Sequence, residues 1–203
     1  MIRTDNYPSK ALAAAVEAIS SLPGVGSRSA LRLALHLLKQ PRENIHRFAE
    51  AVNGLADNVR YCSTCMMVSD GERCAICSDP RRDHNSICVV ESVRDVMSIE
   101  ATGQYHGVYH VLGGIISPIA GIGPSDITIK ELVARADAGK EIILALSGDV
   151  EGETTAFYIY RQVEHTGCTV TTLARGLGFG DDLEYADSLT LGRSIAARQP
   201  FKP

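Results

Sequence analysis

Hydrophobic positions in the first sixty residues recur at the spacing of amphipathic helices. The pattern predicts a helix over about Ser9–Ile19, a second that opens at Ser27 and is stopped by Pro41, and a third over about Arg42–Asn58. The short segment Leu22–Gly26, with the sequence Leu-Pro-Gly-Val-Gly, separates the first two helices. We therefore expect a helical N-terminal region that contains one tight reversal.

After residue 85 the pattern changes to short apolar runs that alternate with helical segments. The predicted strands are Ile87–Val90, Val108–Leu112, Ile142–Leu146 and Thr169–Ala174. The predicted helices are Val93–Glu100, Ile127–Ala138 with Asp126 as its cap, Thr154–His165, and a last one over Ala186–Arg198. Strands that alternate with helices favour a mostly parallel, helix-covered sheet. We expect a multidomain α and α/β protein whose second half is Rossmann-like.

The cysteines add a metal-binding prediction. Four of the six form two Cys-x-x-Cys pairs separated by eight residues: Cys62, Cys65, Cys74 and Cys77. Each pair lets two thiolates converge from one turn, and two such knuckles complete a tetrahedral zinc site. We expect Asp70-Gly71 to form the hairpin turn that brings the knuckles together. Four protein ligands leave no position for water, so the predicted zinc is structural. The alternative is two redox pairs or plain buried thiols. Cys88 and Cys168 lie in apolar runs and are expected to be core residues.

Charge is distributed unevenly along the chain. The net charge of the 203 residues is −4, yet residues 1–60 hold eight Lys and Arg against five Asp and Glu. The remaining 143 residues hold twelve against nineteen. A basic N-terminal region on an acidic body is a first indication of an acidic partner. The alternative is a chance fluctuation, because the excess of positive charge is only three. The apolar runs are too short to span a membrane, and the N-terminus does not resemble a signal peptide, so we expect a cytoplasmic protein without membrane contact.

The reversal between the first two helices has the signature of a helix–hairpin–helix. Its glycines have no side chains to cover the backbone. The free N–H groups at the start of the next helix can therefore donate to a phosphate without any contact to a base. Arg28 and Arg32 lie one turn apart and can hold neighbouring phosphates, and His36 extends this row. The predicted DNA-binding residues are Gly24, Gly26, Arg28, Ser29 and Arg32. We expect sequence-independent binding of single- and double-stranded DNA. The alternative is an ordinary helix turn with solvated arginines.

Three acidic residues follow predicted strands. Glu91 ends the first strand, and Asp149 and Glu151 come just after the third. Functional groups gather beyond the carboxyl ends of parallel strands, and carboxylates suit a hard cation, so one hypothesis is a Mg²⁺ site. The alternative is that they are solvated loop acids or charges at the N-terminus of the next helix.

Taken in order, these features resemble the RecR family of bacterial recombination mediators over essentially the whole chain. The resemblance covers the helix–hairpin–helix at 22–38, the cysteines at 62–77, a Toprim-like domain at about 80–175, and a Walker-B-like segment at 176–187 followed by Leu191-Gly192-Arg193. It implies four parts: a DNA-binding domain at 1–54, a four-cysteine zinc finger at 55–79, a Toprim domain at 80–175, and a C-terminal oligomer contact at 176–203.

The resemblance also implies a function. Members of this family form ring-shaped tetramers that can encircle DNA and are assembled through both terminal regions, so we expect this chain to form a dimer or tetramer in the bacterial cytosol or nucleoid. They bind RecO and in many bacteria RecF, and they help load RecA onto single strands coated by single-strand-binding protein, with no catalytic turnover. Arg28 and Arg32 match the basic positions of the family, the four cysteines match its zinc ligands, and Glu91 and Glu151 match acids associated with partner contact.

One position departs from the family. Members usually read Asn-Pro-Thr-Val-Glu-Gly where this chain reads Ser-Gly-Asp-Val-Glu-Gly at 147–152, so Asp149 restores the acidic pair of catalytic Toprim enzymes. The alternative function is therefore a Mg²⁺-dependent nuclease or primase-like enzyme, and a third is a scaffold that binds only proteins. The chain lacks a phosphate-binding Gly-x-x-x-x-Gly-Lys loop, which argues against ATP hydrolysis. We expect a protein that is not an enzyme, whose glycine-rich segment at 176–180 is a flexible joint and subunit contact.

Overall fold

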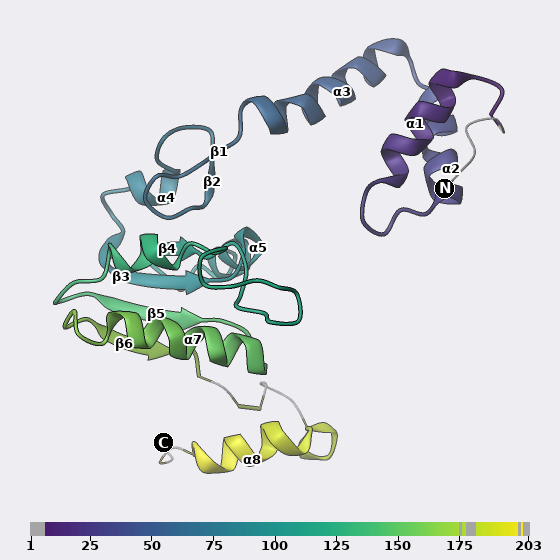
Figure 1. The fold of residues 1–203 in the computed structure, drawn as a ribbon. Helices are drawn as coiled ribbons and strands as arrows, with labels where there is room; N and C mark the ends of the chain where they lie inside the picture. Colours follow the sequence, from purple (N-terminus) through teal and green to yellow (C-terminus); the bar gives the residue numbers. More distant parts are fainter. Residues whose placement is uncertain (1–6, 175, 178–181, 199, 201–203) are drawn as a thin grey trace. The chain divides into compact units, whose positions relative to one another are not determined.

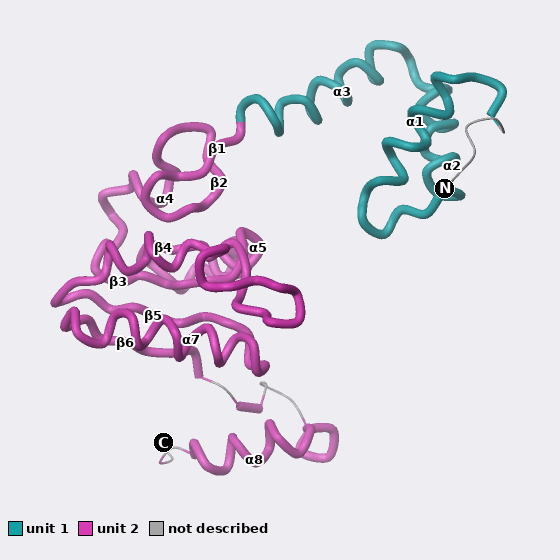
Figure 2. Tube along the Cα trace, in the orientation of Figure 1, with its two compact units in different colours: residues 1–58 teal, residues 59–203 magenta. Residues whose placement is uncertain are grey.

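A computed structural model describes residues 7–174, 176–177, 182–198 and 200, and the chain divides into two compact units, residues 1–58 and 59–203 (Figures 1 and 2). The finer division at residues 54, 79 and 175 stays a prediction. None of the helices in the described parts is both long and apolar enough to cross a membrane.

The first unit contains the three predicted helices, α1 (Lys10–Ser20), α2 (Ser27–Leu38) and α3 (Arg42–Asp57). α1 and α2 pack against each other through Val16 of the first helix and Ala30 and Ala34 of the second. Small residues let the two helices approach closely, but they bury little apolar area. No residue of α3 is buried.

The reversal between α1 and α2 is a turn over Leu22–Val25. The Val25 amide donates to the Leu22 carbonyl at 3.1 Å, with Pro23 second and Gly24 third at φ +78°. These positions are those of a type II turn, which requires a left-handed residue at the third place. Gly26 is different, because at φ −77° it is the extended N-cap of α2. Of the two glycines, only Gly24 therefore takes the positive φ that favours glycine.

The second unit begins with a small module. β1 (Arg60–Tyr61) pairs antiparallel with β2 (Val68–Ser69), and α4 (Ala75–Ser78) follows. The hairpin thus reverses around Cys62–Cys65, and the prediction of a hairpin turn at Asp70-Gly71 is wrong. The knuckle itself closes the reversal: the Met66 amide donates to the Cys62 carbonyl at 3.0 Å, and Met66 takes a left-handed φ of +61°.

The rest of the second unit is an α/β domain, as predicted. Its four strands are all parallel in the order β4-β3-β5-β6: β3 (Asp83–Val90), β4 (Gly107–Val111), β5 (Glu141–Ala145) and β6 (Thr169–Thr172). Side chains alternate along β3, so that Ile87 and Val89 enter one core and Cys88 and Val90 the other. This places Cys88 in the core as expected, and Cys168 is half-buried against the opposite core.

Helices cover both faces of this sheet (Figure 1). α5 (Val93–Glu100) packs Val96 on one face. On the other, α6 (Ile129–Val133) contributes Leu132, and α7 (Val150–Val163) contributes Ile159. Strands buried on both faces explain the continuous apolar runs in the sequence.

Two of the helices predicted in the α/β domain have other boundaries. α6 is shorter than Ile127–Ala138, and Asp126 is not its cap. Instead, the Asp126 carboxylate accepts from the Gly123 amide at 2.8 Å and closes a turn, which leaves Thr128 at the N-cap. α7 begins at Val150 rather than at Thr154, because the Asp149 carboxylate caps it by accepting from the Gly152 amide.

The C-terminal part holds a short 3₁₀ turn, η2 (Leu183–Tyr185), and α8 (Ser188–Ala196). The predicted last helix thus begins at Ser188 rather than Ala186, since Asp187 caps it through the amides of Leu189 and Thr190. Residues 178–180 of the expected glycine-rich joint lie outside the described residues.

Candidate functional site

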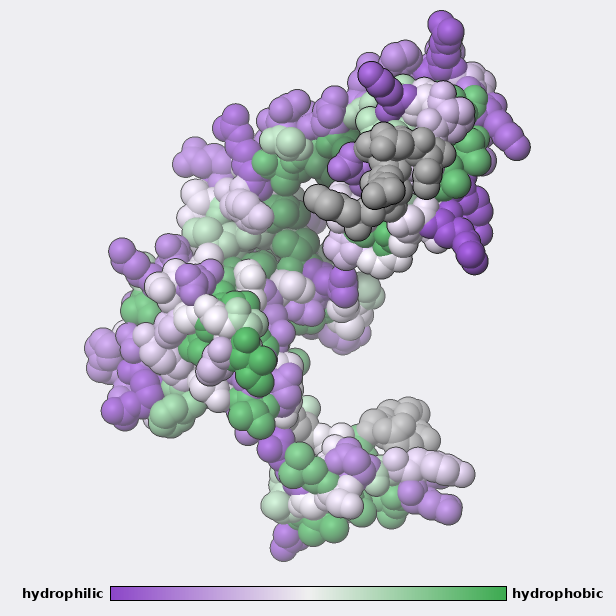
Figure 3. Space-filling model, turned by 45° about the vertical axis from the view of Figure 1, so that its right-hand side comes forward, coloured by the Kyte–Doolittle hydropathy of each residue, from purple (hydrophilic) through white to green (hydrophobic). Residues whose placement is uncertain are grey.

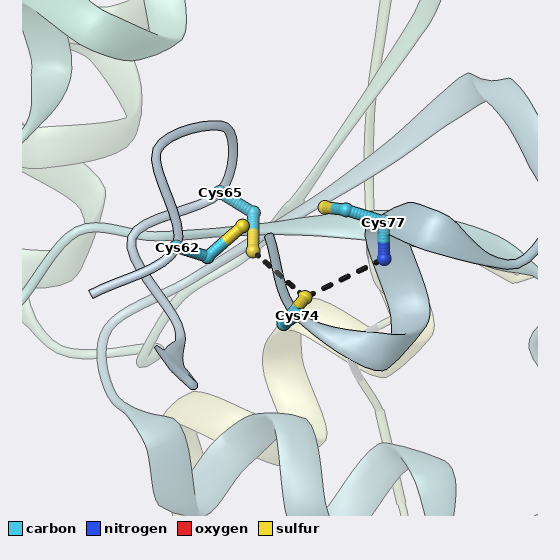
Figure 4. A group of neighbouring side chains, drawn as sticks. All are labelled: Cys62, Cys65, Cys74 and Cys77. Carbon is cyan, nitrogen blue, oxygen red and sulfur yellow. Dashed lines mark hydrogen bonds between the residues drawn. The ribbon is translucent and has the colours of Figure 1, made fainter. Parts of the chain in front are cut away.

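The four predicted zinc ligands converge in the small module. Cys62 and Cys65 come from the hairpin, Cys74 is the N-cap of α4 and Cys77 lies in that helix, and their sulfurs turn toward a common centre (Figure 4). All four side chains are buried, and their Sγ atoms all lie within 4.8 Å of one another. Four sulfurs at this spacing fit a tetrahedral Zn²⁺ shell.

The electrostatics of the cluster also suit a cation. Burial opposes ionisation of Cys62, but backbone N–H groups, first that of Cys74, outweigh it and lower the pKa of Cys62 to about 6. A hydrogen bond with Cys77 and burial raise the pKa of Cys65, and burial raises the pKa of Cys74 to about 11. The site thus holds one easily ionised thiol, Cys62, and two thiols that resist ionisation, Cys65 and Cys74. Zn²⁺ bound to all four sulfurs would stabilise the four thiolates together.

The module is attached to the sheet through its backbone. The Val111 amide of β4 donates to the Cys65 carbonyl at 2.8 Å. Ile76 of α4 packs against the hydrophobic clusters on both faces of the sheet. Within the module, Arg73 donates to the Cys77 carbonyl at 2.6 Å. A metal bound here would therefore stabilise a module that is packed onto the α/β domain, not a separate lobe.

The predicted acids lie beyond the carboxyl ends of β3 and β5, but each accepts a hydrogen bond from a nearby loop or helix residue. Glu91 accepts from the Ser147 amide at 2.6 Å, and Asp149 caps α7. Glu151 accepts from the Ser117 hydroxyl at 2.6 Å. In the described part of the chain, the four cysteines alone bring three or more potential ligand atoms together. The arrangement thus favours the alternative role, in which these acids organise loops and the start of α7, over a Mg²⁺ site.

Sequence reasoning missed the partners that organise this edge of the sheet. Thr155 of α7 is fully buried, and its hydroxyl accepts from the Ile116 amide at 2.9 Å. Ser117 is nearly buried and bridges Glu151 and the Ala120 amide. Isolated Ser and Thr residues in a loop and a helix carry no pattern that would single them out.

The predicted DNA-binding residues lie together at the start of α2. Arg28 and Arg32 are exposed and, with His36 and Lys39, line a shallow groove of about 440 Å³ along the helix. Ser29 is half-buried. A Cβ added at Gly24 or Gly26 would meet no atom within 4 Å, so the bare backbone there is open to an approaching group.

Two further surfaces of the protein are apolar. On α3, Phe48, Val52 and Leu55 are about half to two-thirds exposed. In the second unit, a groove of about 770 Å³ lies between α7, β6 and α8 and is lined mainly by apolar side chains, with an ion pair between Glu153 and Arg193 at its side. Hydrophobic residues are visible at the surface of the C-terminal helix (Figure 3). Surfaces of this kind mark interaction sites.

Family models match the chain along its length. The RecR helix-hairpin-helix model matches residues 12–55, the RecR four-cysteine zinc finger domain 59–79, the Toprim domain 85–174 and the RecR C-terminal model 176–199. Curated relatives named recombination protein RecR are similar over nearly their whole length. Those of Porphyromonas gingivalis and Bacteroides thetaiotaomicron are 52% identical over 197 residues, which cover 96% of this chain and 95% and 96% of theirs. That of Flavobacterium johnsoniae is 52% identical over 198 residues, covering 97% of this chain and 96% of its own.

A helix–hairpin–helix, a four-cysteine zinc finger and a Toprim domain in one chain define a class of multidomain proteins of DNA recombination. With relatives this similar over nearly its full length, the chain belongs to the RecR family. The four clustered cysteines are accordingly the ligands of a structural Zn²⁺. The relatives are named for recombination rather than for an enzymatic activity, and their name supports a role in recombination repair.

Proposed function

We propose that this protein is a cytoplasmic, non-enzymatic recombination mediator that encircles DNA as a ring-shaped oligomer. In this proposal it acts with RecO, and with RecF where present, to help load RecA onto single strands coated by single-strand-binding protein. The observation that carries the proposal is the exposed basic face at the start of α2.

That face suits a phosphate backbone. Arg28, Arg32 and Lys39 are exposed along α2, and no acidic residue occurs between Glu17 and Glu43 to oppose them. The bare N-cap at Gly26 leaves the helix N-terminus open to an anion. These contacts carry no base information, so binding is independent of sequence.

One such face gives only a few phosphate contacts, and their strength falls steeply as salt rises. Several copies in a closed ring would raise the effective concentration of contacts and retain the DNA topologically. A ring needs interfaces that close under symmetry. The exposed apolar face of α3 and the apolar groove beside α8 offer one such surface in each unit, which supports an oligomer.

The second unit supports the partner part of the proposal. Its excess of Asp and Glu repels DNA and attracts a basic protein. Glu91 and Glu151 are held at one edge of the sheet by hydrogen bonds to Ser147 and Ser117. We assign this edge to contact with RecO.

The DNA-binding surface is tested with the double variant Arg28→Ala/Arg32→Ala. We expect affinity for single- and double-stranded oligonucleotides of unrelated sequence to fall uniformly, and the slope of log affinity against log salt to shrink by about 1.5. Fluorescence anisotropy at several salt concentrations measures both. The matched control, Arg94→Ala/Arg161→Ala, removes two exposed arginines from α5 and α7 and should bind normally. Unchanged binding by the α2 variant would refute the assignment.

The ring is tested separately. Light scattering should give two or four times 21.8 kDa. After binding to closed circular DNA, a clamp should withstand a high-salt wash that removes it from the same DNA made linear. A strict monomer, or equal loss from both forms of DNA, would exclude the clamp and leave simple DNA binding.

A further inference from the structure

Arg135, just after α6, is a cation in an unusual setting. Its Nη1 donates to the Tyr109 carbonyl at 2.8 Å and lies 3.1 Å from Nδ1 of His110, a histidine that is fully buried. Burial lowers the pKa of Arg135. Among the described residues, no ion pair joins it to a carboxylate. Burying a guanidinium without a carboxylate partner destabilises the fold, unless a negative charge from another group lies nearby.

The backbone of β4 holds Arg135 beside the zinc module, and interaction with Cys77, Cys65, Cys62 and Tyr105 raises the pKa of Arg135 against the effect of burial. The Tyr109 carbonyl accepts from Arg135, while the Val111 amide, two residues on, donates to the Cys65 carbonyl. In a strand these two groups project from the same side, so β4 holds the knuckle and Arg135 next to each other.

The net charge of the zinc centre indicates a role for Arg135. Four thiolates around Zn²⁺ carry a net charge of −2. One positive group, Arg73, comes from the module itself and donates to the Cys77 carbonyl. Arg135 is a second, and it comes from the α/β domain.

We propose that Arg135 is a positioning residue of the zinc centre, a partly buried guanidinium that balances the negative charge of the zinc tetrathiolate and couples zinc binding to the stability of the sheet. When zinc leaves, nothing holds four thiolates together, so the negative charge beside Arg135 falls while the guanidinium remains in place. The sheet then carries a cation that is less well compensated. This coupling concerns the structural zinc and holds whether or not the protein is a DNA clamp.

The test uses the full chain with Arg135→Gln, which removes the charge but keeps a donor, and Arg135→Lys, which keeps the charge. The matched control is Arg82→Gln, because Arg82 is also largely buried but is paired with the Glu100 carboxylate. Zinc affinity is measured by titration with a chelator and a zinc indicator. The midpoint of thermal unfolding is measured with zinc bound and after its removal.

We expect Arg135→Gln to weaken zinc binding by about tenfold or more, as for other residues that support a metal ligand. It should lower the unfolding midpoint of the zinc-bound protein, and this difference should vanish or reverse without zinc. Arg82→Gln should lower the midpoint equally in both states and bind zinc normally. An equal fall for Arg135→Gln in both states, with unchanged zinc affinity, would overturn the proposal.

If Arg135→Gln does not fold, Arg135→Lys decides. Zinc affinity close to that of wild type supports a role for the charge, and a loss of about tenfold or more contradicts it.

Discussion

Residues 1–58 bury a small core of Val16, Ala30 and Ala34, whereas the sheet of residues 59–203 is covered by hydrophobic residues on both of its faces. One arginine of the second unit shows a related difference. The arginines of α2 project into solvent, while Arg82 is partly buried and paired with Glu100 in the second unit. The two units therefore differ in what stabilises them. The sheet of the second unit has its own hydrophobic core on both faces, even though its surface also offers contacts to partners, whereas the first unit has little core and presents surfaces that a partner or a ligand would complete.

The largest expected effect is the loss of a zinc ligand. Cys77→Ser removes one of four sulfurs, so zinc affinity should fall by more than the roughly 10–100-fold typical of a supporting residue. Because the centre is attached to β4, hydrogen exchange should become faster in residues 60–111 but not in α1 and α2. Zinc content and exchange protection measure the two effects. Cys168→Ser, outside the cluster, should retain zinc, and faster exchange in α1 would contradict the independence of the units.

Two alanine substitutions compare the contribution of a buried and of an exposed side chain to stability. Ile159 of α7 is fully buried and Leu55 of α3 is 67% exposed. Ile159→Ala should destabilise the protein by about 3 kcal/mol, since it leaves a cavity. Leu55→Ala should change stability by no more than about 0.5 kcal/mol. Urea unfolding at low protein concentration measures both. Similar losses for the two variants would mean that α3 is packed against something in the isolated chain.

A smaller effect concerns pH. Burial lowers the pKa of His110 from its usual 6.5 to about 4, and neighbouring Arg135 contributes in the same direction. The unfolded chain therefore takes up this proton first, so stability is lost as the pH falls from about 6.5 toward 4. The loss should be about 2 kcal/mol by pH 5. Urea unfolding of wild type and His110→Asn at pH 7 and pH 5, at equal zinc content, measures it. Exposed His165→Asn is the control, and an equal pH effect in wild type and His110→Asn would disprove the assignment.

Hydrophobic spacing predicted the helices of the first unit and the four strands of the second, because those elements follow from local periodicity. It failed where tertiary contacts decide. Asp126 is a residue type that often caps helices, but here it closes a turn with Gly123. Asp70-Gly71 is a sequence typical of hairpin turns, but the β1–β2 hairpin reverses at the Cys62–Cys65 knuckle instead. The cysteine spacing predicted the zinc ligands. The position of Arg135 beside the zinc module could not be predicted, since a single arginine after a helix forms no pattern and its neighbours come together only on folding.

The attachment of the zinc module to β4 has a consequence for solubility. β4 is one of the two edge strands of the sheet, and the groups on its outer side would otherwise be free to pair with another chain. Here Arg82 bonds the Gly107 carbonyl, Arg135 the Tyr109 carbonyl, Cys65 the Val111 amide and Thr128 the Val111 carbonyl. Side chains and a metal-bound loop thus take the place of a fifth strand. A chain that has lost its zinc should therefore aggregate through β4 before the rest of the sheet unfolds.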